Sequence, residues 1–363
     1  MKVTDIKVHI IETGLEYSIT LHGSHKVQVG IVRIFTDEGI EGNIDYTTPG
    51  FPCKLLAQLI VGLKDRIVGE DPLYTEGIWN RLYRTTRFLM PIYALGCIDA
   101  ALWDIVGKSL NTPVYRLLGG SKDRVRAYAS TRTLPDIEGF QKLSESLVEH
   151  GFTAIKLHPF GEADRDIELC RAIRQTVGDN IDLMIDPVSA YNREEALRVG
   201  QIVDDLNFYW YEEPLPESDL QGYIDLCLQL DVPVIGVDSL NLSLGNYADY
   251  LARGALDMVQ TDAARQGITW SRKLAAIAEG FGRRCQGHAS GPPLHQAANL
   301  HLVASLSNSD FFEMPVPEGL LDTPMKDTIS LEPDGYVSLP QKPGLGLELD
   351  WEKVAKFTID VVE

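Results

Sequence analysis

Three carboxylates stand at equal intervals in the middle of the chain, each at the end of a short apolar run. The runs IDLMID, FYWYEE and PVIGVD end at Asp186, at Glu212 and Glu213, and at Asp238, and the intervals 186 to 212 and 212 to 238 are both 26 residues. That interval fits one strand, loop, helix and return loop, so three successive strands are expected to present an acid at one level. Converging anionic oxygens need a cation between them, and Mg2+ prefers oxygen ligands. Each acid alone could cap the following helix, but the shared register favours a metal site.

Polar side chains also end another apolar run, AIKLHP. It carries Lys156 and His158, and because side chains alternate along a strand, both are expected to point the same way. A Lys directed into a barrel is costly unless it has a task or a partner. We expect a nearby cation and desolvation to lower the pKa of Lys156, which would make it a base near neutral pH.

A second group of polar residues ends three later runs. Asp262 ends DMVQTD and His288 lies in the next run, RRCQGHAS. Adjacent strands lie about 5 Å apart, so the two are expected to form a carboxylate–imidazole pair suited to general acid or base work. His288 alone could equally be a structural histidine. Glu313 in DFFEMP adds a carboxyl group that either donates a hydrogen bond to a substrate when protonated or pairs with a Lys or Arg.

Together these groups suit removal of a proton next to a carboxylate. A metal on the three evenly spaced acids would stabilise the negative charge as the substrate carboxylate becomes an enediolate. Lys156 and His158 lie on one side of that site, and the Asp262–His288 pair lies on the other. Enzymes that combine Mg2+ with a Lys or His base use the same chemistry.

The elements that must position these residues form a parallel barrel. From Val125 onward, strand-like runs alternate with helical segments, and the active site of such a barrel lies where its strands end. Eight strands close a parallel barrel, so we expect an α/β fold, a (β/α)8 TIM barrel with an α+β N-terminal capping domain completed by the C-terminal tail. The expected strand cores are VRAYAS, AIKLHP, IDLMID, FYWYEE, PVIGVD, DMVQTD, RRCQGHAS and DFFEMP.

The N-terminal region has a different pattern. Residues 1 to about 50 alternate as a three-stranded antiparallel meander does, and residues 54–118 follow a helical period. The polar segment EYSITLHGSHK between the first two strands carries His22 and His25, either as a solvated loop or as a flap over a polar ligand. The tail EPDGYVSLPQKPGLGLELD is expected to return to the N-terminal domain. The expected divisions are a capping domain at 1–123, a barrel at 124–325 and a tail at 326–363.

Composition narrows the classes of partner. A formal net charge of −19 disfavours nucleic acid and anionic membrane, because phosphate-binding surfaces need clustered Lys and Arg. No run in the 363 residues approaches the roughly 18 apolar residues of a membrane span, and MKVTDIKVHI lacks the apolar block of a signal peptide. We therefore expect a cytoplasmic protein. Its five cysteines show no ligand-like spacing and are expected to be buried reduced thiols.

Eight motifs occur together along the chain. They are DAALWDIVGKSLNTPVYRLLGG at 99–120, KLH at 156–158, DPVSAYN at 186–192, YEEP at 211–214, PVIGVD, LDMVQTD, GHASG, and PGLGLELD at 343–350. In this combination the chain resembles the enolase superfamily, and specifically its mandelate racemase branch. Each motif alone would be weak, but the set covers essentially the whole length.

The resemblance implies roles for the site residues. Mg2+ would lie on the three evenly spaced acids, a base would lie in the His288 dyad, and Lys156 would face the substrate carboxylate. An N-terminal flap would close the site and make His22 and His25 substrate contacts. The chain departs from the family pattern at Asp238 for a Glu, His158 for the Lys that is the usual second-strand base, Val188 for an Asn or His, and Gln266-Gly267 for Gly-Gly.

These features predict a Mg2+-dependent lyase that dehydrates a sugar acid to a 2-keto-3-deoxy acid. The polar flap and the lack of obvious aromatic clamps favour a polyhydroxy acid as the small-molecule partner, and we expect a homo-oligomer with no nucleic-acid or membrane partner. A racemase or epimerase of a 2-hydroxy or amino acid derivative is an alternative, since bases on both faces suffice. A non-catalytic ligand-binding member is another, motivated by the departures, although Lys156, Asp262 and His288 are all present.

Overall fold

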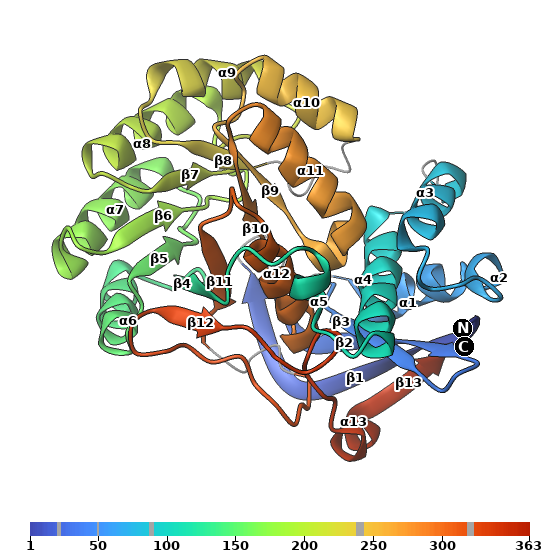
Figure 1. Cartoon of the computed structure of the whole chain (residues 1–363). Coiled ribbons are helices and arrows are strands. Elements are labelled where there is room, and N and C mark those ends of the chain that lie inside the picture. Colours follow the sequence, from blue (N-terminus) through green and yellow to red (C-terminus); the bar gives the residue numbers. More distant parts are fainter. Residues whose placement is uncertain (20–22, 49–50, 87–90, 237–242, 318–322) are drawn as a thin grey trace.

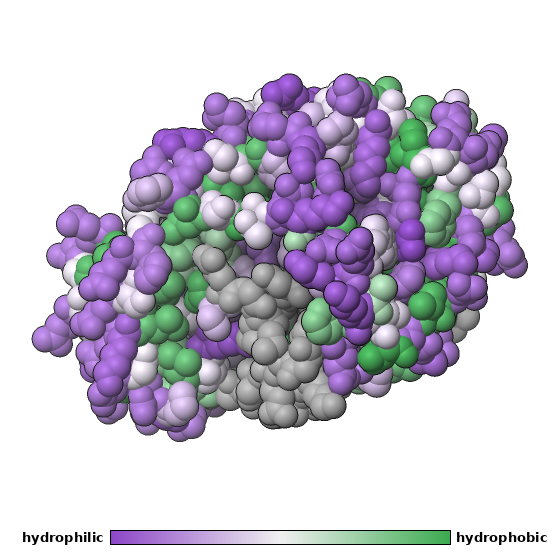
Figure 2. Space-filling model, turned by 90° about the horizontal axis from the view of Figure 1, so that it is seen from below, coloured by the Kyte–Doolittle hydropathy of each residue, from purple (hydrophilic) through white to green (hydrophobic). Residues whose placement is uncertain are grey.

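The computed structural model describes residues 1–19, 23–48, 51–86, 91–236, 243–317 and 323–363. Within these ranges the strands form two sheets, one antiparallel and one largely parallel and curled (Figure 1). None of the described helices is both long and apolar enough to cross a membrane. The face of the molecule in Figure 2 is largely hydrophilic, with scattered hydrophobic residues.

Eight parallel strands of the described chain form the curled sheet, each beside its predecessor, and the last pairs with the first. This order confirms the predicted barrel and all eight strand cores. At the remaining junction, between the seventh and eighth strands, Oε1 of Gln286 accepts hydrogen bonds from the backbone N–H groups of Asp310 (3.1 Å) and Phe311 (3.3 Å). The strands are β4 (Arg124–Ser130), β5 (Ala154–Leu157), β6 (Asp182–Ile185), β7 (Trp210–Glu212), β8 (Val234–Gly236), β9 (Met258–Thr261), β10 (Arg284–Gly287) and β11 (Phe311–Pro315).

Helices follow the strands and surround the sheet (Figure 1). Several begin at side-chain caps that satisfy exposed N–H groups, among them Asp136, Asp219 and the capping boxes at Asn192 and Ser243. Large buried residues, including Tyr128, Trp210 and Phe311, fill the barrel interior. The helices are α6 (Ile137–Glu149), α7 (Ala163–Val177), α8 (Arg193–Asp205), α9 (Leu220–Gln229), α10 (Leu244–Ala252), the π-helical turn η1 (Ala263–Gly267), α11 (Ile268–Gly280) and α12 (Pro293–Ser305).

The N-terminal region contains the predicted meander and helices. Its first two strands are longer than expected, because the polar segment predicted to be a loop continues the ladder through the pairs Glu16↔Lys26 and Ile19↔Gly23. Backbone hydrogen bonding sustains a strand even where its side chains are polar. The elements are β1 (Val3–Ile19), β2 (Gly23–Thr36), β3 (Glu41–Tyr46), α1 (Cys53–Val61), α2 (Lys64–Ile67), α3 (Thr75–Thr86), α4 (Ile92–Ser109) and α5 (Val114–Leu117).

The C-terminal tail contacts both sheets. Its strand β12 (Tyr336–Ser338) pairs antiparallel with β4 of the barrel. Farther on, helix α13 (Trp351–Phe357) leads into β13 (Thr358–Val362), which pairs antiparallel with β1. The last strand therefore adds a fourth member to the N-terminal sheet, while the division of the chain into three parts stays a prediction. All five cysteines are free thiols, and four are buried as expected, whereas Cys227 is partly exposed.

A buried carboxylate joins helix α4 to helix α11. Asp99 accepts hydrogen bonds from the backbone N–H (2.9 Å) and the hydroxyl (2.6 Å) of Thr269 in the first turn of α11. Burial raises the pKa of Asp99 to about 7, against the effect of these hydrogen bonds. Gly267 permits this contact, because its φ is +91° and an added Cβ would lie 2.8 Å from Oδ2 of Asp99. Asp99 thus caps a barrel helix from the N-terminal region.

Two further buried carboxylates also join separate segments of the chain. Asp45 on β3 accepts the backbone N–H of His295 (2.9 Å) at the start of α12 and the hydroxyl of Thr323 (2.7 Å). Burial raises the pKa of Asp45 to about 6. Asp104 on α4 accepts the backbone N–H groups of Asn43 (2.9 Å) and Leu345 (2.8 Å). We call Asp45, Asp99 and Asp104 the seam carboxylates, since they join the N-terminal elements to barrel helices and the tail.

Candidate active site

A buried lysine lies among three carboxylates at the carboxyl ends of the strands. Nζ of Lys156, at the end of β5, lies 2.8 Å from Glu212 and 3.1 Å from Glu313, at the end of β7 and within β11. It also lies 3.6 Å from Asp186, directly after β6. All four side chains are less than 10% exposed. The structure therefore brings together four of the residues predicted to form the site.

These contacts correct one prediction about charge and decide between two alternatives for another residue. The pKa of Lys156 was expected to be lowered, and burial does act in that direction, but Glu212 and Glu313 raise it well above its ordinary value. For Glu313 the sequence left two roles open, a hydrogen-bond donor when protonated or a carboxylate that pairs with a Lys or Arg. Burial alone would raise its pKa, but Lys156 and His288 hold the value at about 2. Glu313 is therefore a carboxylate paired with Lys156, the other alternative drawn from the sequence.

Glu212 is fixed from two further sides. Its Oε2 accepts a hydrogen bond from the indole N–H of Trp210 (2.9 Å), and its Oε1 accepts one from the side-chain amide of Gln260 (3.0 Å). Burial raises the pKa of Glu212 to about 7, and Asp186 and Glu313 add to this against Lys156. Negative charge is thus crowded at this carboxylate.

His158 lies on the same side as Lys156, as the alternation along the strand predicted. Its Nε2 lies 3.1 Å from Oδ2 of Asp186, and its Nδ1 lies 2.6 Å from the carbonyl oxygen of Thr131. Both ring nitrogens therefore face acceptors, and Nε2 must leave Asp186 before it can accept a proton. Burial by itself would raise the pKa of Asp186, but His158 and Lys156 hold it below its ordinary value.

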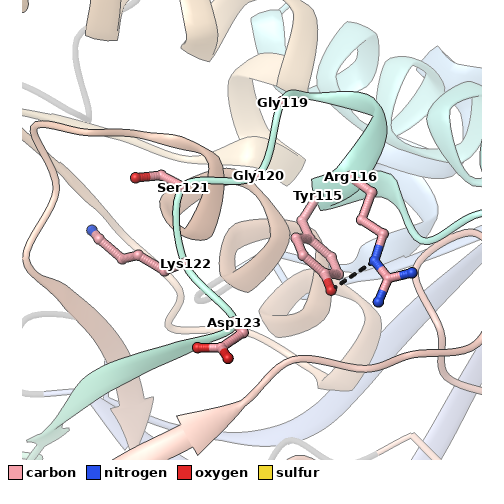
Figure 3. Close-up of a pocket in the computed structure, with 7 residues that line it drawn as sticks. All are labelled: Tyr115, Arg116, Gly119, Gly120, Ser121, Lys122 and Asp123. Atoms are coloured by element: carbon pink, nitrogen blue, oxygen red, sulfur yellow. Dashed lines mark hydrogen bonds between the residues drawn. The ribbon is translucent and has the colours of Figure 1, made fainter.

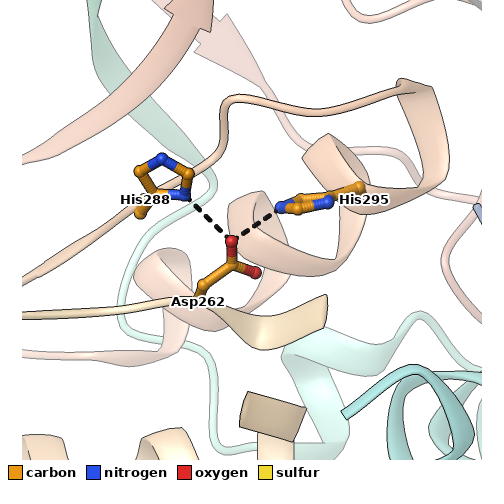
Figure 4. Close-up of side chains that lie close together, drawn as sticks. All are labelled: Asp262, His288 and His295. Atoms are coloured by element: carbon orange, nitrogen blue, oxygen red, sulfur yellow. Dashed lines mark hydrogen bonds and ion pairs between the residues drawn. The ribbon is translucent and has the colours of Figure 1, made fainter. Parts of the chain in front are cut away.

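The Asp262–His288 contact predicted from adjacent strands is present. Nδ1 of His288 lies 2.9 Å from Oδ2 of Asp262, and Nε2 of His295 lies 2.8 Å from the same oxygen (Figure 4). The other oxygen accepts the backbone N–H groups of Ala264 (2.8 Å) and Arg265 (3.0 Å). Although burial opposes it, His295, His288 and Arg265 hold the pKa of Asp262 well below its ordinary value.

Sequence reasoning missed His295 and its neighbour Asn299. Both lie on α12, and the side-chain amide of Asn299 donates to Oδ1 of Asp262 (3.2 Å). Their spacing of four residues puts both on one face of a helix that follows His288 directly. The available signal was this pair of polar residues, four positions apart in the largely apolar run PLHQAANLHLVAS.

Two groups of side chains could hold a metal ion. Asp186 and Glu212 are buried carboxylates on neighbouring strand ends, and the crowded negative charge at Glu212 fits a hard divalent cation with oxygen ligands. Among the described residues, Asp262, His288 and His295 also offer ligand atoms within 4.8 Å of one another. Their mixed N and O donors suit a transition metal rather than Mg2+, and the hydrogen bonds within the group already account for their approach.

The side-chain positions of three predicted site residues are not described. Asp238, the third expected metal ligand, and His22 lie outside the described residues. The backbone of His25 belongs to β2, opposite Tyr17 of β1. The roles of these three residues stay predictions.

A separate concave surface lies at the connection between α5 and β4 (Figure 3). Its two cationic side chains are already engaged: Nε of Arg116 donates to the hydroxyl of Tyr115 (3.0 Å), and Nζ of Lys122 donates to the carbonyl oxygens of Leu306 and Ser309. It adjoins the amino end of β4, the end of a barrel strand associated with stability rather than catalysis. We therefore place the active site at the carboxyl ends.

Family models identify the class of protein. Residues 5–119 match the N-terminal domain of the mandelate racemase/muconate lactonizing enzyme family, and residues 140–354 match the enolase C-terminal domain-like model. The chain belongs to this family, which confirms the resemblance drawn from the motifs.

Individual relatives are sugar-acid enzymes. The chain is 30% identical over 334 residues to arabinonate dehydratase of Saccharolobus solfataricus, a match covering 89% of this chain and 88% of the relative. It is 28% identical over 380 residues to D-galactarolactone cycloisomerase of Agrobacterium fabrum, covering 98% and 99%. A crystal structure of D-glucarate dehydratase from Agrobacterium tumefaciens complexed with magnesium is 30% identical and superposes with a TM-score of 0.89, covering 99% of this chain and 100% of that chain.

Proposed function

We propose that the protein is a Mg2+-dependent dehydratase of a sugar acid. The observation that carries the proposal is the pair of proton-transfer groups at one end of the barrel. Lys156 lies among the strand-end carboxylates, and Glu313 links it to the other group by accepting the backbone N–H of Ala289 (2.7 Å), next to His288. With such groups on two sides of a substrate, one can remove a proton from the carbon next to the carboxylate, and the other can assist the departure of hydroxyl from the neighbouring carbon.

The chain's residues divide the work between those two sides. We assign proton abstraction next to the substrate carboxylate to the Lys156 and His158 side. The carboxylates around Lys156 raise its pKa, so Lys156 acts as a base only when a bound cation takes over those carboxylates and lowers that pKa. We assign protonation of the departing hydroxyl to His288, because Asp262 stabilises the imidazolium that donates the proton. Before His158 can abstract the proton, its Nε2 must turn away from Asp186 and toward the substrate. A cation bound to Asp186 would take the place of His158 beside that carboxylate.

We assign Mg2+ to Asp186, Glu212 and Asp238. When bound, the ion would stabilise the negative charge that develops on the substrate carboxylate as the proton leaves. The crowded charge at Glu212 and the magnesium complex of a relative support this assignment. Trp210 and Gln260 orient Glu212 toward the site.

The dehydratases among the relatives favour a polyhydroxy acid as substrate. A second candidate is a cycloisomerase of a sugar-acid lactone or anhydro sugar acid, favoured by two relatives with those activities. Both reactions fit the same acid–base groups, and they differ in whether the product keeps the mass of the substrate.

The deciding experiment is a screen of sugar acids, their lactones and anhydro forms in D2O with Mg2+, followed by mass spectrometry. A dehydratase gives a 2-keto acid that has lost one water, whereas a cycloisomerase gives a product of the same composition as the substrate apart from deuterium taken up from the solvent. Solvent exchange with inversion alone would indicate the racemase alternative. Neither product nor exchange from any substrate would favour the non-catalytic alternative and overturn the proposal.

Asp186→Asn tests the metal assignment separately. It should lower Mg2+ affinity by at least about tenfold and abolish turnover while the barrel stays folded, because a strand-end ligand contributes little packing. Asp182→Asn is the matched control, since Asp182 begins the same strand and pairs with Arg126 (2.6 Å). Unchanged Mg2+ binding by calorimetry in Asp186→Asn would remove Asp186 from the ligand set.

A further inference from the structure

His288 and His295 share one oxygen of Asp262, and this sharing is the basis of the inference. Oδ2 lies 2.9 Å from Nδ1 of His288 and 2.8 Å from Nε2 of His295, and the two rings approach it from opposite sides (Figure 4). Asp262 is fully buried and its Oδ1 accepts backbone N–H groups. An ionised carboxylate only accepts hydrogen bonds, so each nitrogen that faces it carries a proton.

His295 is fixed as a donor by its surroundings. It is 1% exposed, and its Nδ1 has no hydrogen-bond partner among the described residues. A second proton at Nδ1 would be buried without an acceptor there, which costs free energy. The N-terminal region holds the residue in place, because Asp45 accepts its backbone N–H. Gly291 makes room for the ring, since an added Cβ would lie 2.4 Å from Nδ1.

We propose that His295 is a positioning residue that sets the basicity of His288 by competing for Oδ2 of Asp262. A carboxylate oxygen that already accepts a strong hydrogen bond stabilises an adjacent imidazolium less than an unshared one does. His288 consequently gives up its proton more readily than it would in a simple Asp–His pair. The proposal rests on the proposed acid–base role of His288.

Other charged groups surround the pair, and they stay constant when only His295 is changed. Arg265 lies 3.4 Å from Oδ2 of Asp262, and Glu313 accepts the N–H of the residue after His288. The groups that face the two histidines and Asp262 are Asp45 from β3, Tyr93 and Cys97 from α4, Arg265 from η1, and Glu313 from β11 with its partner Lys156.

The test is an NMR titration of the His288 ring in the full, isotope-labelled chain with Mg2+ present, its signal assigned by loss in His288→Asn. In His295→Leu, Asp262 serves His288 alone, so the titration midpoint should rise by on the order of one pH unit. His295→Gln places an amide N–H near the position of Nε2 and should keep the midpoint close to that of the unmodified protein. An unchanged or lower midpoint in His295→Leu, or equal shifts in both variants, would overturn the proposal.

Gly291→Ala is the second variant, for the case that His295→Leu does not fold. It keeps the imidazole but displaces it from Oδ2, so the midpoint should again rise, and a midpoint that stays in place contradicts the proposal. A transition metal found in the purified protein and lost in His295→Gln would also overturn it, since His295 would then be a ligand. The titration needs no substrate, so failure of the proposed dehydratase activity leaves this test intact.

Discussion

Two groups of buried carboxylates in this molecule are neutralised in different ways. The seam carboxylates accept hydrogen bonds mainly from backbone N–H groups and hydroxyls, as Asp99 does from Thr269. The mouth carboxylates, Asp186, Glu212 and Glu313, surround one buried ammonium group, that of Lys156.

The difference separates structural acids from functional ones. Backbone donors are fixed by the fold of the segments that carry them, so each seam carboxylate keeps its hydrogen bonds only in the native arrangement of the chain. A lysine shared among three carboxylates leaves an excess of negative charge, and buried charges without full compensation are costly. A cation-binding site requires such an excess of negative charge. Its presence distinguishes the mouth carboxylates from the seam carboxylates.

The largest expected effect comes from removing the shared cation. Lys156→Met leaves the mouth carboxylates without their ammonium partner, which should cost about 3–5 kcal/mol of unfolding free energy in EDTA. It should also lower kcat/KM by at least about 10³, since it removes a group placed at the reacting centre. Mg2+ should raise the Tm of this variant more than that of the unmodified protein. Thermal melts with and without Mg2+ check these outcomes.

Lys108→Met is the seam counterpart. Lys108 lies 2.6 Å from Asp104 but is 35% exposed, and Asp104 keeps two backbone donors after the change. The expected cost is about 1 kcal/mol or less, because exposed ion pairs contribute little. If both lysine variants lost equal stability, the distinction between seam and mouth would fail.

An intermediate effect is expected from the pH dependence of the seam. The pKa of Asp99, about 7, is raised above its unfolded value of about 3.9. The folded state therefore binds more protons between these values, and the contribution of Asp99 to stability is present at low pH and lost as pH rises to about 7. Asp99→Asn removes this titration. The amount by which its unfolding free energy falls below that of the unmodified protein should therefore shrink by about 2–3 kcal/mol from pH 5 to pH 8.

Urea unfolding at pH 5, 6.5 and 8 measures this difference. Asp225→Asn, at a side chain that is 46% exposed, serves as the control and should show no such trend. If the unfolding free energies of Asp99→Asn and the unmodified protein differed by the same amount at all three pH values, Asp99 would not titrate between pH 5 and pH 8.

The sequence was most informative where a pattern is local. The β/α repeat fixes where each strand ends, so the eight strand cores and the level of Asp186 and Glu212 followed from spacing. The Asp262–His288 pair followed in the same way, since the residues end neighbouring strands. Family membership was predictable because motifs occur along the whole chain.

Features that depend on distant neighbours were not predictable. The direction of the Lys156 pKa shift depends on which carboxylates meet its Nζ, and the nearest come from β7 and β11. His295 was missed because its helix reads as an ordinary apolar segment until the end of β9 is placed beside it. The pairing of β12 with β4 joins residues about 210 positions apart, which no local period encodes.

The smallest expected effect concerns one indole in each region. The N–H of Trp210 donates to the mouth carboxylate Glu212, whereas that of Trp103 donates to the hydroxyl of Thr269, which in turn donates to the seam carboxylate Asp99; both indole contacts measure 2.9 Å. Trp210→Phe should weaken Mg2+ binding by roughly tenfold, because a hydrogen bond to a charged group contributes about 1.5–3 kcal/mol, part of which the ion replaces.

Trp103→Phe makes the same chemical change at the seam and should lower Tm slightly without changing Mg2+ affinity. Calorimetric titration of both variants with Mg2+ compares them directly. Equal loss of Mg2+ affinity in the two would mean that the seam and the mouth are coupled, so that a carboxylate matched by backbone donors still influences the metal site. Loss in Trp210→Phe alone would assign the orientation of Glu212 to the indole.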